Sequence, residues 1–117
     1  MTPLEHRETS HRFIEQAVVE HADGDLLQAS EKTWGAAAHA VKAIAERRGW
    51  RHDTHSSLFR AVNNIANELH NPEVVLLFQA ASDSHKNFYE GWMSEVRVAG
   101  NIGRVEKLLE ILLEGVP

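Results

Sequence analysis

Between Leu27 and Ile44, the residues of one helical stripe recur at alternating steps of three and four positions. An α-helix completes one turn in about 3.6 residues, so this spacing places every member of the stripe on one face. The stripe consists of Leu27, Ser30, Trp34, Ala37, Val41 and Ile44. Asp25 and Gln28 can cap the start of this helix, and Gly49 is placed to end it. So long an amphipathic helix must pack its apolar face against other elements.

Four further segments carry signals of the same kind. At the N-terminus, Thr2, Pro3 and Glu5 have the arrangement of a capping box with proline at the first helical position. The expected stripes of these four helices are Leu4, His11, Ile14, Val18 and His21; Leu58, Val62, Ile65 and Leu69; Val74, Phe78, Ala81, His85, Phe88 and Trp92; and Val98, Ile102, Val105, Leu109 and Leu112. The whole chain is therefore expected to be helical.

The last of these helices is expected to follow Ser94. Glycine lowers helix propensity, so Gly100 and Gly103 leave open a later start, near Asn101. No segment shows the convincing period of two that marks a strand. Short connections make consecutive helices antiparallel. The sequence predicts an all-α fold, an up-and-down four-helix-bundle core with one additional helix, in a single domain of residues 1–117.

Composition narrows the class of protein. The chain has 117 residues and no cysteine, which excludes disulfides, thiolate nucleophiles and cysteine-based metal centres. Its formal net charge of −5 argues against the basic surface of a non-specific duplex binder, although a local basic patch is compatible with it. No apolar run approaches the roughly 18 residues that span a bilayer. We expect a cytoplasmic protein without membrane contact, cofactor or metal.

The segment from Ser84 to Glu90 concentrates side chains that can carry chemistry. Within it His85 shares a helical face with Tyr89, whereas Asn87 lies on another. Because His85 belongs to an apolar stripe, a core histidine with satisfied nitrogens is the plainer interpretation, and a ligand or proton-transfer role is the alternative. A catalytic role would need a carboxylate from another helix.

A second group surrounds the indole ring in the most regular helix, where polar and charged positions border an aromatic side chain. The plainer interpretation of this group is a solvated helix face. Taken with the segment above, the candidate ligand-binding residues are Lys32, Trp34, His39, His85, Asn87 and Tyr89.

A third group, at the end of the same helix, consists of Arg47, Arg48, Trp50 and Arg51. Guanidinium groups can hold phosphates while an indole stacks a base, so these are candidate nucleic-acid contacts. Arginines at a helix C-terminus also complement the helix dipole without any ligand. His52 and His55 form an H-x-x-H pair, but no acidic third ligand stands at local spacing, so no metal site is predicted.

Two segments resemble a known family. Residues 29–43, ASEKTWGAAAHAVKA, followed by residues 84–90, SHKNFYE, look like the small archaeal PaREP-type proteins, a branch of the HEPN superfamily. The resemblance implies a four-helix core with one extra helix, commonly in a homodimer, and an association with RNA or nucleotides. Some HEPN proteins are ribonuclease toxins or partners of minimal nucleotidyltransferases.

The nuclease members of that superfamily use an arginine and a histidine a few residues apart near the start of a late helix. In this sequence Arg60 and His70 are too far apart, and Arg97 is followed by no histidine. Arg47 and His52 have a suitable spacing, but they straddle the predicted end of a helix. The pattern of the nucleases is therefore not matched on a helix.

The sequence thus favours a non-catalytic or regulatory module that binds RNA or a nucleotide, as a homodimer. Two alternatives stay open. One is a metal-independent ribonuclease that uses His85 or His52 with Arg47 or Arg48. The other is a partner subunit of a toxin–antitoxin or nucleotidyltransferase pair.

Overall fold

The computed structural model describes residues 1–117 and contains five α-helices and no strand. The helices are α1 (Pro3–Ala22), α2 (Leu26–Arg48), α3 (His55–Leu69), α4 (Glu73–Glu90) and α5 (Glu95–Leu109). A π-helical segment, Glu110–Glu114, continues α5 toward the C-terminus. The predicted all-α fold with five helices is confirmed.

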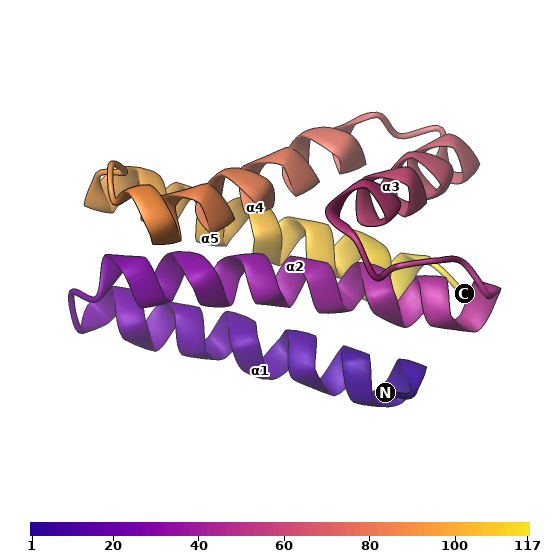
Figure 1. Cartoon of the computed structure of the whole chain (residues 1–117), viewed down its shortest axis with the longest axis horizontal. Coiled ribbons are helices and arrows are strands. Elements are labelled where there is room, and N and C mark those ends of the chain that lie inside the picture. Colours follow the sequence, from indigo (N-terminus) through magenta and orange to yellow (C-terminus); the bar gives the residue numbers. More distant parts are fainter.

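Four of the helices run side by side in alternating directions (Figure 1). α1 and α2 form one antiparallel hairpin, α4 and α5 form a second, and α2 packs against both helices of the second hairpin. α3 joins α2 to α4 and packs on both of them. This arrangement is the four-helix core with one additional helix that the sequence predicts.

The helix ends follow the capping signals in the sequence. Thr2 Oγ1 accepts the backbone N–H of Glu5 at 3.1 Å, and the Glu5 carboxylate accepts the N–H of Thr2 at 2.9 Å. Asp25 caps α2 by accepting the N–H of Gln28 at 3.0 Å. At the other end of α2, Gly49 has a φ of 70°, a left-handed conformation that glycine adopts without strain. These local contacts set where the bundle turns.

α5 begins directly after Ser94, as the sequence predicts, and not at the later start that its glycines left open. Ser94 caps its first turn, and the helix continues unbroken through Gly100 and Gly103. Each glycine costs about 1 kcal/mol of helix stability, but the burial of Val98 in this first half compensates through tertiary packing. The later start near Asn101 is therefore wrong.

The core is built mainly from the apolar stripes of α2, α3, α4 and α5. Ile44, Ile65 and Phe78 are fully buried, and the stripe expected for the last helix is buried along its whole length. In these four stripes the exposed members are Leu27, in the first turn of α2, and Trp92, which lies beyond the end of α4. The helical periodicity therefore identified most of the core.

α1 does not bury the stripe that its sequence indicated. Of that stripe only Ile14 is buried, whereas Leu4, His11 and Val18 are exposed; the other buried positions are His6, Thr9, Ser10 and Ala17. α1 packs on the alanine-rich side of α2, where Ser10 Oγ donates a hydrogen bond to the Ala36 carbonyl at 2.7 Å. A close contact of this kind accommodates small and polar side chains, so the hydrophobic pattern did not identify the buried face.

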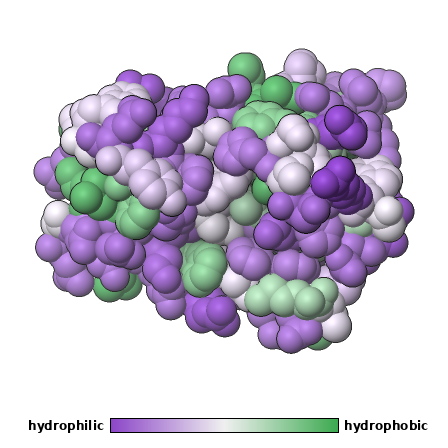
Figure 2. Space-filling view, in the orientation of Figure 1, coloured by the Kyte–Doolittle hydropathy of each residue, from purple (hydrophilic) through white to green (hydrophobic).

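No helix is both long and apolar enough to cross a membrane. On the face shown in Figure 2, hydrophobic side chains form small separate patches among hydrophilic ones. The most exposed large apolar side chain is Val96, at 83%, followed by Tyr89 and Leu76.

Candidate functional site

Three ring-bearing side chains that are far apart in the sequence meet along α2 and α4. The ring centre of Trp34 lies 4.8 Å from that of His55 and 5.1 Å from that of His85, and the two imidazoles are 5.9 Å apart. Tyr89, one turn further along α4, meets His85 edge-on at 5.4 Å. We call Trp34, His55, His85 and Tyr89 the ring cluster. It combines stacking surfaces with groups that form hydrogen bonds.

The ring cluster rests on the hydrophobic core. The buried ring of Phe78 lies 5.5 Å from Trp34, and it in turn contacts Phe59 edge-on at 4.9 Å. Trp34 itself is half-buried, whereas Tyr89 is exposed. Aromatic packing of this kind contributes about 0.5–1.5 kcal/mol per pair beyond burial. The core therefore holds the inner rings in place and leaves the outer ones accessible.

Polar contacts fix the orientation of both histidines. His85 Nδ1 lies 3.2 Å from Glu31 Oε1, and His55 Nε2 lies 3.2 Å from Ser82 Oγ. Glu31 belongs to α2, one turn before Trp34, so the carboxylate that a catalytic His85 would need from another helix is present. A carboxylate bonded to one ring nitrogen orients the other nitrogen for further hydrogen bonding.

The surroundings of His55 favour the neutral form of its ring. Partial burial of its ring lowers its pKa below the usual value, and the charges of His85 and Lys86 lower it further. A neutral imidazole can donate from one nitrogen and accept at the other. Lys86 is exposed on α4, so this part of the surface offers a neutral ring and a cation together.

Asn87, predicted as a ligand-binding residue, lies inside the protein and is 1% exposed. Its Nδ2 donates to Ser30 Oγ at 2.9 Å, and its Oδ1 accepts the backbone N–H of Met93 at 2.8 Å. Both hydrogen-bonding ends of the amide are therefore used within the chain.

Lys32 and His39 lie toward α1, away from the ring cluster. The Lys32 ammonium is 4.6 Å from the ring centre of Phe13, and His39 Nδ1 is 2.9 Å from His6 Nδ1. Burial lowers the pKa of His39 to about 4, and the charges of His6 and Lys42 act in the same direction. The six predicted ligand residues are thus divided among two surfaces and the interior.

Each arginine of the third group already has a partner within the chain. The pairs are Arg47 with the Val116 carbonyl, Arg48 with Glu68, and Arg51 with Asp53. The two ion pairs have N–O distances of 2.6 Å, and the Arg48 guanidinium also lies 5.4 Å from the ring centre of Trp50. We call Arg47, Arg48, Trp50 and Arg51 the arginine turn. A phosphate bound there would compete with two carboxylates.

The histidines of the H-x-x-H pair belong to different clusters. His55 joins the ring cluster, whereas His52 Nε2 lies 2.6 Å from Glu46 Oε2. His6 completes this second group, in which one possible ligand atom from each side chain lies within 4.8 Å of the others. Burial lowers the pKa of His6, and the hydrogen bond from His52 lowers the pKa of Glu46.

Sequence spacing could not reveal this second group. Forty positions separate His6 from Glu46, and the chain folds α1 back along α2 to bring them together. No sequence pattern singles out His6, because its burial is seen only in the structure.

The chain is similar to one known protein family and to a solved structure. The archaeal PaREP1/PaREP8 family matches residues 5–109. The crystal structure of a protein from Sulfolobus solfataricus is similar, with a TM-score of 0.82 and 24% sequence identity over 93% of this chain and 97% of that chain. No curated protein matches the sequence. Because the family match extends from the first turn of α1 to the end of α5, the chain belongs to the archaeal PaREP1/PaREP8 family.

Proposed function

We propose that this protein is a helical module that binds a nucleobase-containing ligand, either single-stranded RNA or a nucleotide, at the ring cluster. The observation that carries the proposal is the convergence of Trp34, His55, His85 and Tyr89 beside the exposed cation of Lys86. Stacking of a base on an aromatic side chain contributes about 1–3 kcal/mol, and lysine attracts the phosphate backbone.

The four rings have different roles in this proposal. Tyr89 is 74% exposed and presents a phenol ring on which a base can stack. Trp34 is packed against Phe78 and forms the fixed floor of the site. His55 and His85 supply hydrogen bonds to base edges, and Glu31 keeps the His85 ring in place.

We favour the ring cluster over the arginine turn because the cations of the arginine turn are already paired with acidic side chains. Arg48 and Arg51 are paired with carboxylates, whereas Lys86 makes no ion pair. An exposed ion pair is weak, at about 0–1 kcal/mol, so the turn remains a secondary contact for a longer RNA.

Binding without cleavage fits this geometry better than ribonuclease activity. Cleavage of RNA by a histidine needs a base near the ribose hydroxyl and a cation near the developing phosphorane. The His85–Glu31 pair and the nearby Lys86 favour the ribonuclease alternative. However, no arginine, the cation that the nuclease pattern pairs with its histidine, forms a hydrogen bond or ion pair with the ring cluster. Labelled RNA incubated with the protein between pH 6 and 8 tests this point. Turnover that is absent from His85→Ala would establish the ribonuclease.

Binding itself is tested by titrating the purified chain into a labelled single-stranded RNA, and by calorimetry with AMP. We expect Tyr89→Ala and Lys86→Ala each to weaken binding at least fivefold, because each removes an exposed contact without disturbing the core. Val19→Ala, an exposed substitution on α1, is the matched control and should bind as the unchanged chain does. If Arg51→Ala weakens binding and Tyr89→Ala does not, the ligand binds at the arginine turn instead.

The resemblance to HEPN proteins also predicts a homodimer. Leu76 and Val96 are exposed on neighbouring parts of α4 and α5 and line one groove, which gives apolar surface that a second copy could cover. Light scattering should then give twice the 13.2 kDa mass of one chain. A stable complex with a nucleotidyltransferase-type protein, found on co-purification of the native operon, would instead support the partner-subunit alternative.

A further inference from the structure

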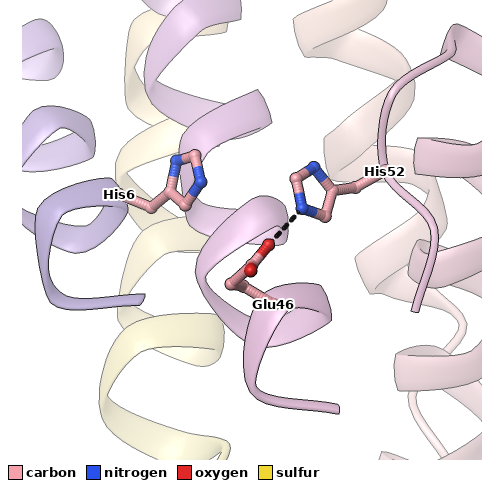
Figure 3. Close-up of side chains that lie close together, drawn as sticks. All are labelled: His6, Glu46 and His52. Carbon is pink, nitrogen blue, oxygen red and sulfur yellow. Dashed lines mark hydrogen bonds and ion pairs between the residues drawn. The ribbon is translucent and has the colours of Figure 1, made fainter. Parts of the chain in front are cut away.

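A separate group of polar side chains lies where α1, the end of α2 and the following loop meet (Figure 3). His6 comes from the first turns of α1, Glu46 from the last turn of α2, and His52 from the loop. Figure 3 shows the two imidazoles and the carboxylate gathered around one space. One nitrogen or oxygen atom from each side chain lies within 4.8 Å of the others.

We propose that His6, Glu46 and His52 form a binding site for a divalent transition-metal ion of the zinc type. Two imidazoles and one carboxylate are a donor set that zinc accepts, and three protein ligands leave a fourth position for water. This proposal concerns a different surface from the ring cluster and does not depend on the function proposed there.

The present separations can adjust to an ion. Ligand atoms about 2.1 Å from a tetrahedral zinc ion are about 3.4 Å apart. The present separations lie on both sides of this value, because His52 Nε2 is 2.6 Å from Glu46 Oε2 and the full group spans up to 4.8 Å. The Glu46 side chain is 43% exposed and that of His52 is 22% exposed, so both have room to rotate. Entry of an ion would replace their direct hydrogen bond.

The third ligand is already positioned. His6 is buried, and its Nδ1 lies 2.9 Å from Nδ1 of His39. One of these nitrogens must donate and the other must accept. When His6 donates, its Nε2 keeps the lone pair that a metal needs. A ligating histidine commonly donates its other N–H to a second group in this way, which fixes the ring. His39 is therefore a positioning residue for the site.

The charges around His6 are mixed. Glu46 supplies a negative charge that acts on His6, whereas Lys42 and the N-terminus supply positive ones. The ring centre of His6 lies 5.1 Å from that of His39 and 5.7 Å from that of His52, so three imidazoles meet beside one carboxylate. Imidazole ligands suit zinc, copper, nickel and iron, whereas calcium and magnesium prefer oxygen alone.

The test is calorimetric titration of the full chain, stripped with a chelator, with Zn²⁺ alone. We expect one ion per chain and at least a tenfold loss of affinity in His52→Ala and in Glu46→Gln. His39→Ala should weaken binding by about 10–100-fold, as the loss of a supporting contact does at other metal sites. His11→Ala is the matched control, because it removes an exposed histidine from the same helix as His6.

Because His6 is buried, the test relies on the two accessible ligands, and circular dichroism checks that these variants keep their helices. Replacement of Zn²⁺ by Co²⁺ gives a second readout, a visible absorption spectrum that His52→Ala should lose. The proposal is overturned if no saturable binding occurs. It is equally overturned if His11→Ala weakens binding as much as His52→Ala does, or if all variants bind alike.

Discussion

Asn87 Nδ2 donates a hydrogen bond to Ser30 Oγ at 2.9 Å, and both residues are buried where α4 crosses α2. The other end of the same amide accepts the N–H of Met93, so one side chain connects two helices and the turn that leads to α5. Asn87 therefore connects α2, α4 and the turn before α5 inside the protein.

Replacing Asn87 by alanine should lower the free energy of unfolding by about 2 kcal/mol, because the Met93 N–H and the Ser30 hydroxyl are left buried without this partner. Urea denaturation followed by circular dichroism measures the change. Asn63→Ala, at an exposed position of α3, is the control and should leave stability unchanged or slightly higher. Equal stability of the two variants would show that the buried amide contributes nothing.

Replacing either of two helical glycines, Gly35 or Gly103, by alanine should change the free energy of unfolding, but in opposite directions. A Cβ atom on Gly35 would lie 2.7 Å from Phe13 Cδ2, whereas one on Gly103 would have nothing within 4 Å. Gly103→Ala should raise the free energy of unfolding by about 0.5–1 kcal/mol through helix propensity. Gly35→Ala should lower it by about 1 kcal/mol, because overpacking costs more than propensity gains. Thermal unfolding of both variants measures the difference, and a stabilising Gly35→Ala would contradict the close packing of α1 on α2.

The elements were predictable because their signals are local. Thr2 and Glu5 are three positions apart, Gly49 ends its helix alone, and the stripe from Val98 to Leu112 needs only a period. The two capping signals act within one turn of helix, and the stripe repeats every three or four residues over about four turns, so each can be recognised without knowing which segments pack together.

The site was less predictable because its contacts join distant segments. The loop after α2 carries His55 to Trp34, twenty-one positions earlier, and α1 brings His6 to Glu46. The polarity of Asn87 predicts a place on a ligand surface, whereas its burial depends on how α4 meets α2. Periodicity locates an apolar face, but it does not show which polar side chains are enclosed between two such faces.

The pKa of His55 predicts how stability depends on pH. It is lowered in the folded protein, and an unfolded histidine titrates near 6.5, so below this pH the unfolded chain binds a proton that the folded chain resists. The contribution of His55 is thus complete above about pH 6.5 and falls as the pH decreases toward its folded pKa. The groups facing it are Trp34 on α2 and Ser82, His85 and Lys86 on α4.

A comparison with His55→Gln isolates this contribution from those of the other histidines. Urea midpoints measured from pH 8 to pH 5 should differ by a constant amount above neutrality. Below about pH 6.5 the difference should move steadily in favour of the glutamine variant, which has no proton to accept. Parallel profiles over the whole range would mean that His55 titrates alike in the folded and unfolded chains.

Zinc should stabilise the fold if it binds at His6, Glu46 and His52, because the ion would join α1 to the end of α2 and to the loop. At a free Zn²⁺ concentration 100 times the Kd, the stabilisation is about 2.7 kcal/mol, which for a chain of this size raises Tm by about 10 °C. The amide of His6, bonded to the Thr2 carbonyl in the first turn, should also exchange its hydrogen more slowly. Both effects should disappear in His52→Ala but persist in His11→Ala. A zinc-dependent rise in Tm that is the same in both variants would place the stabilising ion elsewhere on the chain.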